Sequence, residues 1–123
     1  MTKDGEKLRG KVAVVTAASS GIGLGAARAL ATRGWSLVLM SRSEKIEAAA
    51  AELGATALRG DVTNEDDMVR LVATALERYG RIDGAVINTG HPPKGEILQI
   101  PDEDWHKAME IVLMPTVRAM RHI

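Results

Sequence analysis

The sequence predicts an α/β fold with a parallel sheet, because short apolar runs alternate with longer segments of helical periodicity and short loops join them. The runs are rich in Val, Leu and Ile, and their near-continuous apolarity is typical of strands covered on both faces. Alternation of this kind indicates βαβ units with right-handed crossovers. The expected strands are residues 12–16, 36–40, 55–59 and 82–88.

Helices are expected between these strands. The first covers residues 21–33, and Gly34 is its stop signal. The second starts after Ser43, a good N-cap residue, and ends at Gly54. Apolar residues in the first helix recur at helical spacing and predict one buried stripe. That stripe comprises Ile22, Ala26, Ala29 and Leu30.

The third helix is expected to start at Thr63, with Asp66 three places on as a capping-box partner, and to stop at Gly80. A fourth helix opens at residues 101–104 and meets Pro115, which lacks a backbone N–H, so a kink or restart is expected there. The inward residues of the third helix are expected to be Met68, Leu71, Val72, Ala75 and Leu76.

Composition limits the class of protein. A length of 123 residues with 46% hydrophobic and 26% charged residues predicts one globular domain. The 16 basic and 16 acidic residues are mixed along the chain, so no basic face for nucleic acid is expected. The chain contains no cysteine, and its three histidines do not have the spacing of metal ligands, so no metal site is expected. A charged N-terminus and the lack of an apolar run of about 20 residues argue against a signal peptide or membrane span, which makes the cytoplasm the expected location.

A glycine-rich turn at residues 16–25 separates the first strand from the first helix. Such a turn can hold the pyrophosphate of a dinucleotide, because free N–H groups and the helix dipole favour an anion there. Its glycines would let the backbone approach the phosphates and the helix pack on the strand. The alternative is a purely structural role, in which the turn is a tight connection that binds no ligand. The candidate binding residues of the turn are Thr16, Ala18, Ser19, Ser20, Gly21, Ile22 and Gly23.

The end of the second strand predicts which dinucleotide binds. No Lys follows the glycines, which argues against a P-loop. An Asp or Glu would stand after the second strand in an NAD site, but this chain has Ser41 and Arg42 there. A guanidinium suits a 2′-phosphate through charge-assisted hydrogen bonds, so NADP(H) is preferred over NAD(H). The absent acid also weakens a methyltransferase interpretation. The alternative is that Arg42 is a solvated loop residue.

These features resemble the short-chain dehydrogenases/reductases over the whole chain. Residues 16–23 are similar to the family's Thr-Gly-x-x-x-Gly-Ile-Gly signature, and Trp105 falls in its Glu-Asp-Trp helix start. Asp61 and Val62 resemble the Asp-Val that borders the adenine, although Asp61 could simply cap the turn before Thr63. Residues 83–90 are similar to Asp-x-Leu-Val-Asn-Asn-Ala-Gly. The resemblance thereby implies that Asn88, Thr89 and Gly90 shape the pocket of the nicotinamide-side ribose.

The resemblance implies a Rossmann-type doubly wound parallel sheet with its strands in the order 3-2-1-4. Residues 1–123 would form a single NAD(P)-binding Rossmann domain, incomplete at its C-terminal end after about four strands and part of the following long helix. The edge of the fourth strand would then be unpaired. We therefore expect the isolated chain to be marginally stable or self-associating.

Three residues depart from the family's pattern. Ala17 replaces its first Gly, and if that position requires a positive φ, the methyl group costs about 1 kcal/mol or slightly more. Ile87 replaces the first Asn of Asn-Asn-Ala-Gly. Val112, counted from Trp105, falls where many members carry a proton-relay Asn. The stretch 88–90 followed by Pro resembles a branch near the 3-oxoacyl-[acyl-carrier-protein] reductases, which often lacks this Asn.

The family's catalytic Ser and Tyr-x-x-x-Lys have no counterpart in the chain, whose only tyrosine is Tyr79. One interpretation is the NADP(H)-binding portion of a reductase that exchanges hydride between NADPH and a ketone, 3-oxoacyl or alcohol substrate, a homotetramer when full length. The other is a non-catalytic dinucleotide-binding or interaction module, naturally truncated or decayed. A reading frame continuing past Ile123 into Tyr-x-x-x-Lys would favour the first, and a stop codon the second.

Overall fold

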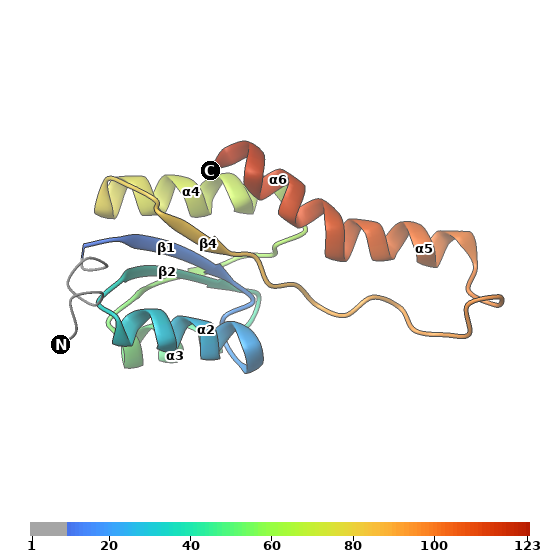
Figure 1. Cartoon of the computed structure of the whole chain (residues 1–123), viewed down its shortest axis with the longest axis horizontal. Coiled ribbons are helices and arrows are strands. Elements are labelled where there is room, and N and C mark those ends of the chain that lie inside the picture. The colour runs from blue at the N-terminus through green and yellow to red at the C-terminus, as the bar shows by residue number, and fades with distance from the viewer. Residues whose placement is uncertain (1–9) are drawn as a thin grey trace.

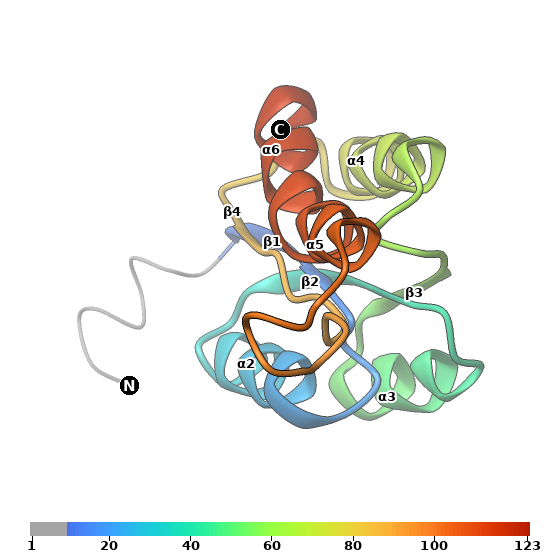
Figure 2. The same cartoon turned by 90° about the vertical axis from the view of Figure 1, so that its right-hand side faces the viewer.

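The computed structural model describes residues 10–123, in which four parallel strands form one sheet in the order β3-β2-β1-β4 (Figures 1 and 2). All three neighbouring pairs are parallel. The predicted Rossmann-type doubly wound class and strand order are therefore confirmed. The strands are β1 (Val12–Thr16), β2 (Ser36–Ser41), β3 (Thr56–Arg59) and β4 (Gly84–Val86).

Helices cover both faces of this sheet. One pair packs on each face, and a long helical rod extends beyond the end of the sheet (Figure 1). The first face carries α2 (Gly21–Thr32) and α3 (Lys45–Leu53), and the second carries α4 (Glu65–Tyr79) and α6 (Met114–His122). The rod consists of α5 (Asp102–Ala108), the π-helical stretch η1 (Met109–Leu113) and α6.

Alternate residues of the central strand β1 supply the two halves of the core. Val12 and Val14 pack with Met68 and Leu71 of α4. Successive side chains of a strand point to opposite faces of the sheet. The intervening residues Ala13 and Val15 pack with α2 and α3 on the other face. Every residue of β1 is buried, which explains why its sequence is apolar without alternation.

The predicted buried stripe of α2 is correct in part, because Leu30 packs against the core and Ala26 is half-buried. Gly23 and Ala27 are the buried residues, whereas Ile22 is 81% exposed and Ala29 is exposed. A Cβ on Gly23 would lie 2.3 Å from the carbonyl oxygen of Ala17. The helix therefore turns its smallest side chains toward the sheet to pack closely, and the larger Ile22 is left outside.

The N-terminus of α4 also differs from the prediction. Asn64 is the N-cap, and its side chain accepts the Asp67 N–H at 3.1 Å. The expected capping box of Thr63 and Asp66 is wrong, because the Thr63 hydroxyl bonds to Asp61 instead. Leu76, which was expected to point inward, is 49% exposed and flanks the buried stripe of α4.

The fourth strand is shorter than predicted, and the last helix is irregular. β4 ends at Val86, because Asn88 leaves the sheet to pair its backbone with the Thr16 hydroxyl. The irregularity expected at Pro115 is present: the π-helical stretch η1 ends at Leu113, and regular α-helix restarts at Met114 with Pro115 in the first turn of α6. Among residues 10–123, no helix is both long and apolar enough to cross a membrane.

β4 forms one edge of the sheet, beside an apolar groove of about 430 Å³. The groove lies between β4 and α6, and Met120 on its rim is 77% exposed. Its lining is Ala85, Ile87, Thr116, Ala119, Met120 and Ile123. An uncovered strand edge favours association with another strand, which is consistent with the expected self-association of the isolated chain. Self-association stays a prediction.

Candidate dinucleotide-binding site

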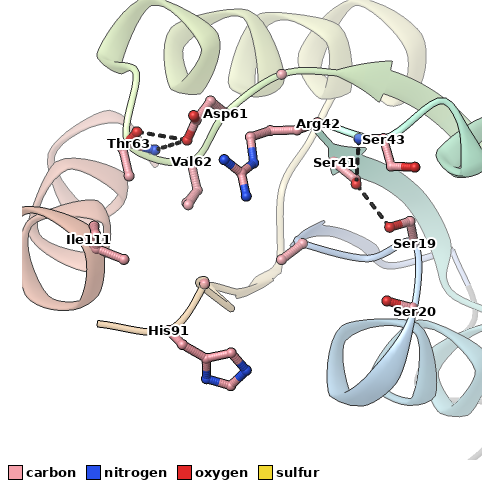
Figure 3. A pocket seen from close by; sticks show the side chains of 13 residues that line it. Ser19, Ser20, Ser41, Arg42, Ser43, Asp61, Val62, Thr63, His91 and Ile111 are labelled. Carbon is pink, nitrogen blue, oxygen red and sulfur yellow. Dashed lines mark hydrogen bonds between the residues drawn. The ribbon is translucent and has the colours of Figure 1, made fainter. Parts of the chain in front are cut away.

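A cavity of about 570 Å³ opens at the carboxyl ends of the strands (Figure 3). In open α/β sheets this crevice is where ligands bind, because the helix N-termini and the strand-end loops meet there. The walls come from the turn after β1, the end of β2, the β3–α4 connection, the loop after β4 and one residue of η1. The lining comprises Ala17, Ser19, Ser20, Ser41, Arg42, Ser43, Gly60, Asp61, Val62, Thr63, Gly90, His91 and Ile111.

Half of the residues singled out in the sequence line this cavity. They are Ser19, Ser20, Ser41, Arg42, Asp61, Val62 and Gly90. Thr16, Ala18 and Gly23 are buried beneath the turn instead, and Asn88 and Thr89 are half-buried beside it. Gly21 and Ile22 are exposed at the start of α2.

Other lining residues were missed by sequence reasoning. Ser43 and Thr63 follow the predicted residues directly, and a search of neighbouring hydroxyls could have found them. Gly60 also lines the cavity, and a Cβ there would lie 2.8 Å from Met40 Sδ, which explains the glycine at this position. His91 and Ile111 come from a loop and a helix irregularity whose placement carries no local signal in the sequence.

The turn after β1 is held in a strained form by its neighbours. Ala17 has φ 48°, the only positive φ of a non-glycine residue between residues 10 and 123. Thr16 Oγ1 donates to the Asn88 carbonyl at 2.7 Å and accepts the Asn88 N–H at 2.8 Å. The turn is therefore tied to the segment after β4, and Ala17 has the positive φ at which a methyl group is costly.

The N-terminus of α2 is open toward the cavity. Its N-cap, Ser20, makes no side-chain hydrogen bond to the described residues, and the first turn contains no acidic residue. Free N–H groups and the positive end of the helix dipole thus lie directly after Ser20, which lines the cavity. This arrangement suits an anion such as a phosphate.

Two serines join the turn to the end of β2. The buried Ser41 hydroxyl donates to Ser19 Oγ at 3.0 Å and accepts the Ser43 N–H at 3.1 Å. The Ser41 carbonyl accepts the Gly60 N–H at 3.0 Å, which places the β3–α4 connection against the same strand end. Three walls of the cavity therefore meet at Ser41 (Figure 3).

The guanidinium of Arg42 projects into the cavity (Figure 3). Within residues 10–123 it forms no ion pair, a property it shares with the arginines at positions 33, 59, 78 and 121, whereas those at 28, 70, 81 and 118 are paired. Its backbone carbonyl accepts a hydrogen bond from Arg59 Nη2 at 3.4 Å. An exposed guanidinium without a carboxylate partner is a ready site for an external anion.

Asp61 caps its own turn and also lines the cavity. Its Oδ1 accepts the Thr63 N–H at 2.8 Å and the Thr63 hydroxyl at 2.7 Å. Partial burial opposes ionisation, but these two hydrogen bonds and the nearby Arg42 charge hold the pKa of Asp61 below its ordinary value. Asp61 is therefore an anion at neutral pH.

The single tyrosine lies at the other end of the sheet. The Tyr79 hydroxyl hydrogen-bonds Thr56 Oγ1 at 3.1 Å, where β3 begins, whereas the cavity lies where the strands end. Val112 is 43% exposed, and its neighbour Ile111 is the η1 residue that lines the cavity. Among the described residues, therefore, no tyrosine that could act as a general acid lies in the cavity.

Fold and cavity together define a Rossmann-type dinucleotide-binding domain. The family model described as short chain dehydrogenase matches residues 11–123. The chain therefore belongs to the short-chain dehydrogenase/reductase family, whose members bind NAD(P). Among curated relatives, it is 37% identical over 119 residues to "Dehydrogenase/reductase SDR family member 4" of Caenorhabditis elegans. That match covers 90% of this chain and 46% of the relative.

Solved structures show the same likeness. The crystal structure of L-sorbose reductase from Gluconobacter frateurii, complexed with NADPH and L-sorbose, has a TM-score of 0.83 and 33% identity. The match covers 94% of this chain and 46% of the L-sorbose reductase chain. An actinorhodin polyketide ketoreductase with NADPH has a TM-score of 0.83 and 34% identity, with coverages of 91% and 45%. The chain spans about half the length of these relatives.

Proposed function

We propose that this chain is the NADP(H)-binding portion of a short-chain dehydrogenase/reductase that transfers hydride between NADPH and a ketone, 3-oxoacyl or alcohol substrate. The observation that carries the proposal is the Arg42 guanidinium, which projects into the cavity at the end of β2 without a carboxylate partner among the described residues. A 2′-phosphate is the group of NADP that this cation would bind. Two solved relatives also hold NADPH.

The residues present fit a dinucleotide along the carboxyl ends of the strands. The open N-terminus of α2 would hold the pyrophosphate, with hydroxyls from the turn beside it. Asp61 and Val62 would border the adenine, because they form the wall next to Arg42. Asn88, Thr89 and Gly90 would lie at the nicotinamide-side ribose. When bound, the cofactor supplies the hydride.

Chemistry beyond hydride supply needs groups that this chain lacks. Proton transfer to a carbonyl oxygen requires an acid beside the hydride donor, and Tyr79 is committed to Thr56 at the far end of the sheet. We therefore assign binding, and no acid–base role, to residues 10–123. The Asn-Thr-Gly stretch supports a place near the 3-oxoacyl reductases, and we propose a cytoplasmic homo-oligomer, tetrameric in a full-length member.

The test is coenzyme binding by fluorescence titration with NADPH and NADH. The wild-type chain should bind NADPH more tightly than NADH. Arg42→Ala should weaken NADPH binding about tenfold or more and leave NADH binding unchanged, because a charge-assisted hydrogen bond to the 2′-phosphate is lost. Arg28→Ala, which removes an exposed arginine paired with Glu52, is the matched control and should change neither affinity. Equal wild-type affinities for the two coenzymes would refute the NADP preference.

A further inference from the structure

Helix α6, the last part of the rod, packs on α4 with little apolar burial (Figure 2). Its only buried residues are Pro115 and Ala119, and Ala119 belongs to the same core cluster as Met68 and Leu71 of α4. A helix that buries so little apolar surface gains little from the hydrophobic effect. The polar contacts between α6 and α4 therefore carry a larger share of its attachment.

Two basic side chains of α6 reach the start of α4. His122 Nε2 lies 3.1 Å from Glu65 Oε1, in the first turn of α4. One turn earlier on α6, Arg118 Nη1 donates to the Thr63 carbonyl at 3.4 Å. Thr63 and Glu65 flank Asn64, the N-cap of α4. The end of the rod thus contacts the chain on both sides of this cap.

Several charged groups surround the contact between His122 and Glu65. Glu110 is paired with Arg118 and Asp67 with Arg70. Strand β4, next to α6, contributes no charged side chain. Among these residue types, only histidine ordinarily changes charge between about pH 5 and 8. The charged groups on the packed elements are Glu65, Asp66 and Asp67 of α4, Arg118 and Arg121 of α6, and Glu110 of η1.

Glu65 is an anion over this whole pH range. The hydrogen bond with His122 holds the pKa of Glu65 below its ordinary value of 4.5, and the charges of Arg118 and Arg121 act in the same direction, although desolvation opposes them. Both helix ends are matched to their charges, because Glu65 lies at the N-terminus of α4 and His122 in the last turn of α6. The strength of the contact therefore depends on the charge of the imidazole.

We propose that the contact between His122 and Glu65 is a pH-sensitive clasp that fixes the end of the rod to the start of α4. An imidazolium forms a charge-assisted hydrogen bond to the carboxylate, whereas a neutral imidazole forms only a weaker one. The clasp is closed at about pH 5 to 6 and weakens as the pH rises through the ordinary range of histidine. It lies beside the β3–α4 connection, whose Asp61 and Thr63 line the cavity. The proposal goes beyond the NADP(H) site and does not depend on it.

The experiment is a double-mutant cycle with Glu65→Gln and His122→Gln on the 123-residue chain. The equilibrium constant of unfolding is measured by urea denaturation at pH 5.5 and pH 8.5. The coupling between the two substitutions should be about threefold at pH 5.5 and approach one at pH 8.5, because both side chains are partly exposed and the pair depends on the imidazolium.

Two further variants separate the proton from the position. His122→Lys keeps a cation at both pH values, so its coupling to Glu65 should stay at about threefold at pH 8.5. Arg121→Gln is the matched control, because it removes a neighbouring charge that does not titrate in this range. Its coupling to Glu65 should be the same at the two pH values.

An NMR titration of the Glu65 carboxyl gives a second readout. His122→Gln should move the pKa of Glu65 back toward 4.5, and by more than Arg121→Gln does, because the hydrogen bond is the largest cause of its lowering. Equal coupling of His122 and Glu65 at pH 5.5 and pH 8.5 would show a contact that does not depend on the proton. Absence of coupling at pH 5.5 would show that the pair does not hold α6. Either result overturns the proposal and leaves the coenzyme titration unaffected.

Discussion

At the amino end of the sheet, the Asp83 carboxylate accepts the Val12 N–H at 2.8 Å and pairs with Arg81, while the Tyr79 hydroxyl bonds to Thr56. At the carboxyl end, the Arg42 guanidinium forms no ion pair within residues 10–123, and the Ser20 side chain does not cap its helix. These side chains at the first end bond to one another or to the strands, although the buried Trp35 indole N–H beside the start of β2 has no partner among the described residues. Donors at the second end face a cavity. The difference separates the polar groups that hold the fold from those that are available to a ligand.

Gly23 is an exception to this difference between the two ends of the sheet, and its substitution should give the largest change in stability. Gly23 lies at the carboxyl end but serves packing, because a Cβ there would lie 2.3 Å from the Ala17 carbonyl oxygen. Gly23→Ala should lower the free energy of unfolding by about 3 kcal/mol or more, measured by urea denaturation. Gly25→Ala is the control on the same helix, where nothing lies within 4 Å, and it should raise stability by up to about 1 kcal/mol. Equal stabilities of the two variants would contradict the close packing of α2.

Tyr79→Phe tests the amino end. Loss of the hydroxyl bond to Thr56 should reduce the free energy of unfolding by about 1 kcal/mol, followed by circular dichroism in urea. Affinity for NADPH should stay the same, since the hydroxyl lies at the opposite end from the cavity. A weaker NADPH affinity at unchanged stability would break the proposed division between the two ends.

Ala17→Gly should have a smaller effect, of opposite sign. Relief of the left-handed backbone at φ 48° stabilises the folded chain, and the extra freedom of glycine in the unfolded chain offsets part of the gain. We expect a net increase of about 0.5 kcal/mol in the free energy of unfolding. A decrease measured by thermal unfolding would mean that the turn prefers alanine and is not strained.

The smallest effect should come from the Thr63 hydroxyl. Because the pKa of Asp61 is lowered in the folded chain, its contribution to stability is complete above the ordinary carboxyl pKa of about 3.9 and is lost as the pH falls through the lowered value. Thr63→Val should move the pKa of Asp61 back toward its ordinary value in an NMR titration. Thr74→Val, whose hydroxyl bonds to the Arg70 carbonyl, should leave that pKa unchanged.

The fold was largely predictable from the sequence because its signals are local. The apolar runs marked all four strands, and Gly54 and Gly80 end their helices in left-handed conformations. The errors arise where a tertiary contact decides. Ile22 has the spacing of a buried residue, yet close packing against the Ala17 carbonyl favours Gly23 at the sheet. Thr63 has the sequence position of an N-cap residue, yet its hydroxyl donates a hydrogen bond to the Asp61 carboxylate instead of capping α4.

The site was predictable in part for the same reason. Ser41 and Arg42 lie at the end of β2, and Asp61 lies two residues after β3. Parallel strands end at one edge of the sheet, so the meeting of these residues could be foreseen. Ile111 was not foreseeable, because a π-helical stretch changes which residue of the rod faces the cavity. His91 lies in a loop whose path depends on the whole structure. The roles of these residues in cofactor binding remain predictions.

The π-helical stretch η1 also bears on insertion and deletion in this chain. Because a π turn accommodates one residue more than an α turn, η1 corresponds to a single inserted residue within a helix. Removing one residue between 109 and 113 would restore regular α-helical pairing. Because the π turn absorbs the extra residue, such a deletion would leave α5 and α6 with nearly the same faces toward the body of the protein. One residue removed from the regular helix α6 would instead rotate the two sides of the deletion by about 100° relative to each other.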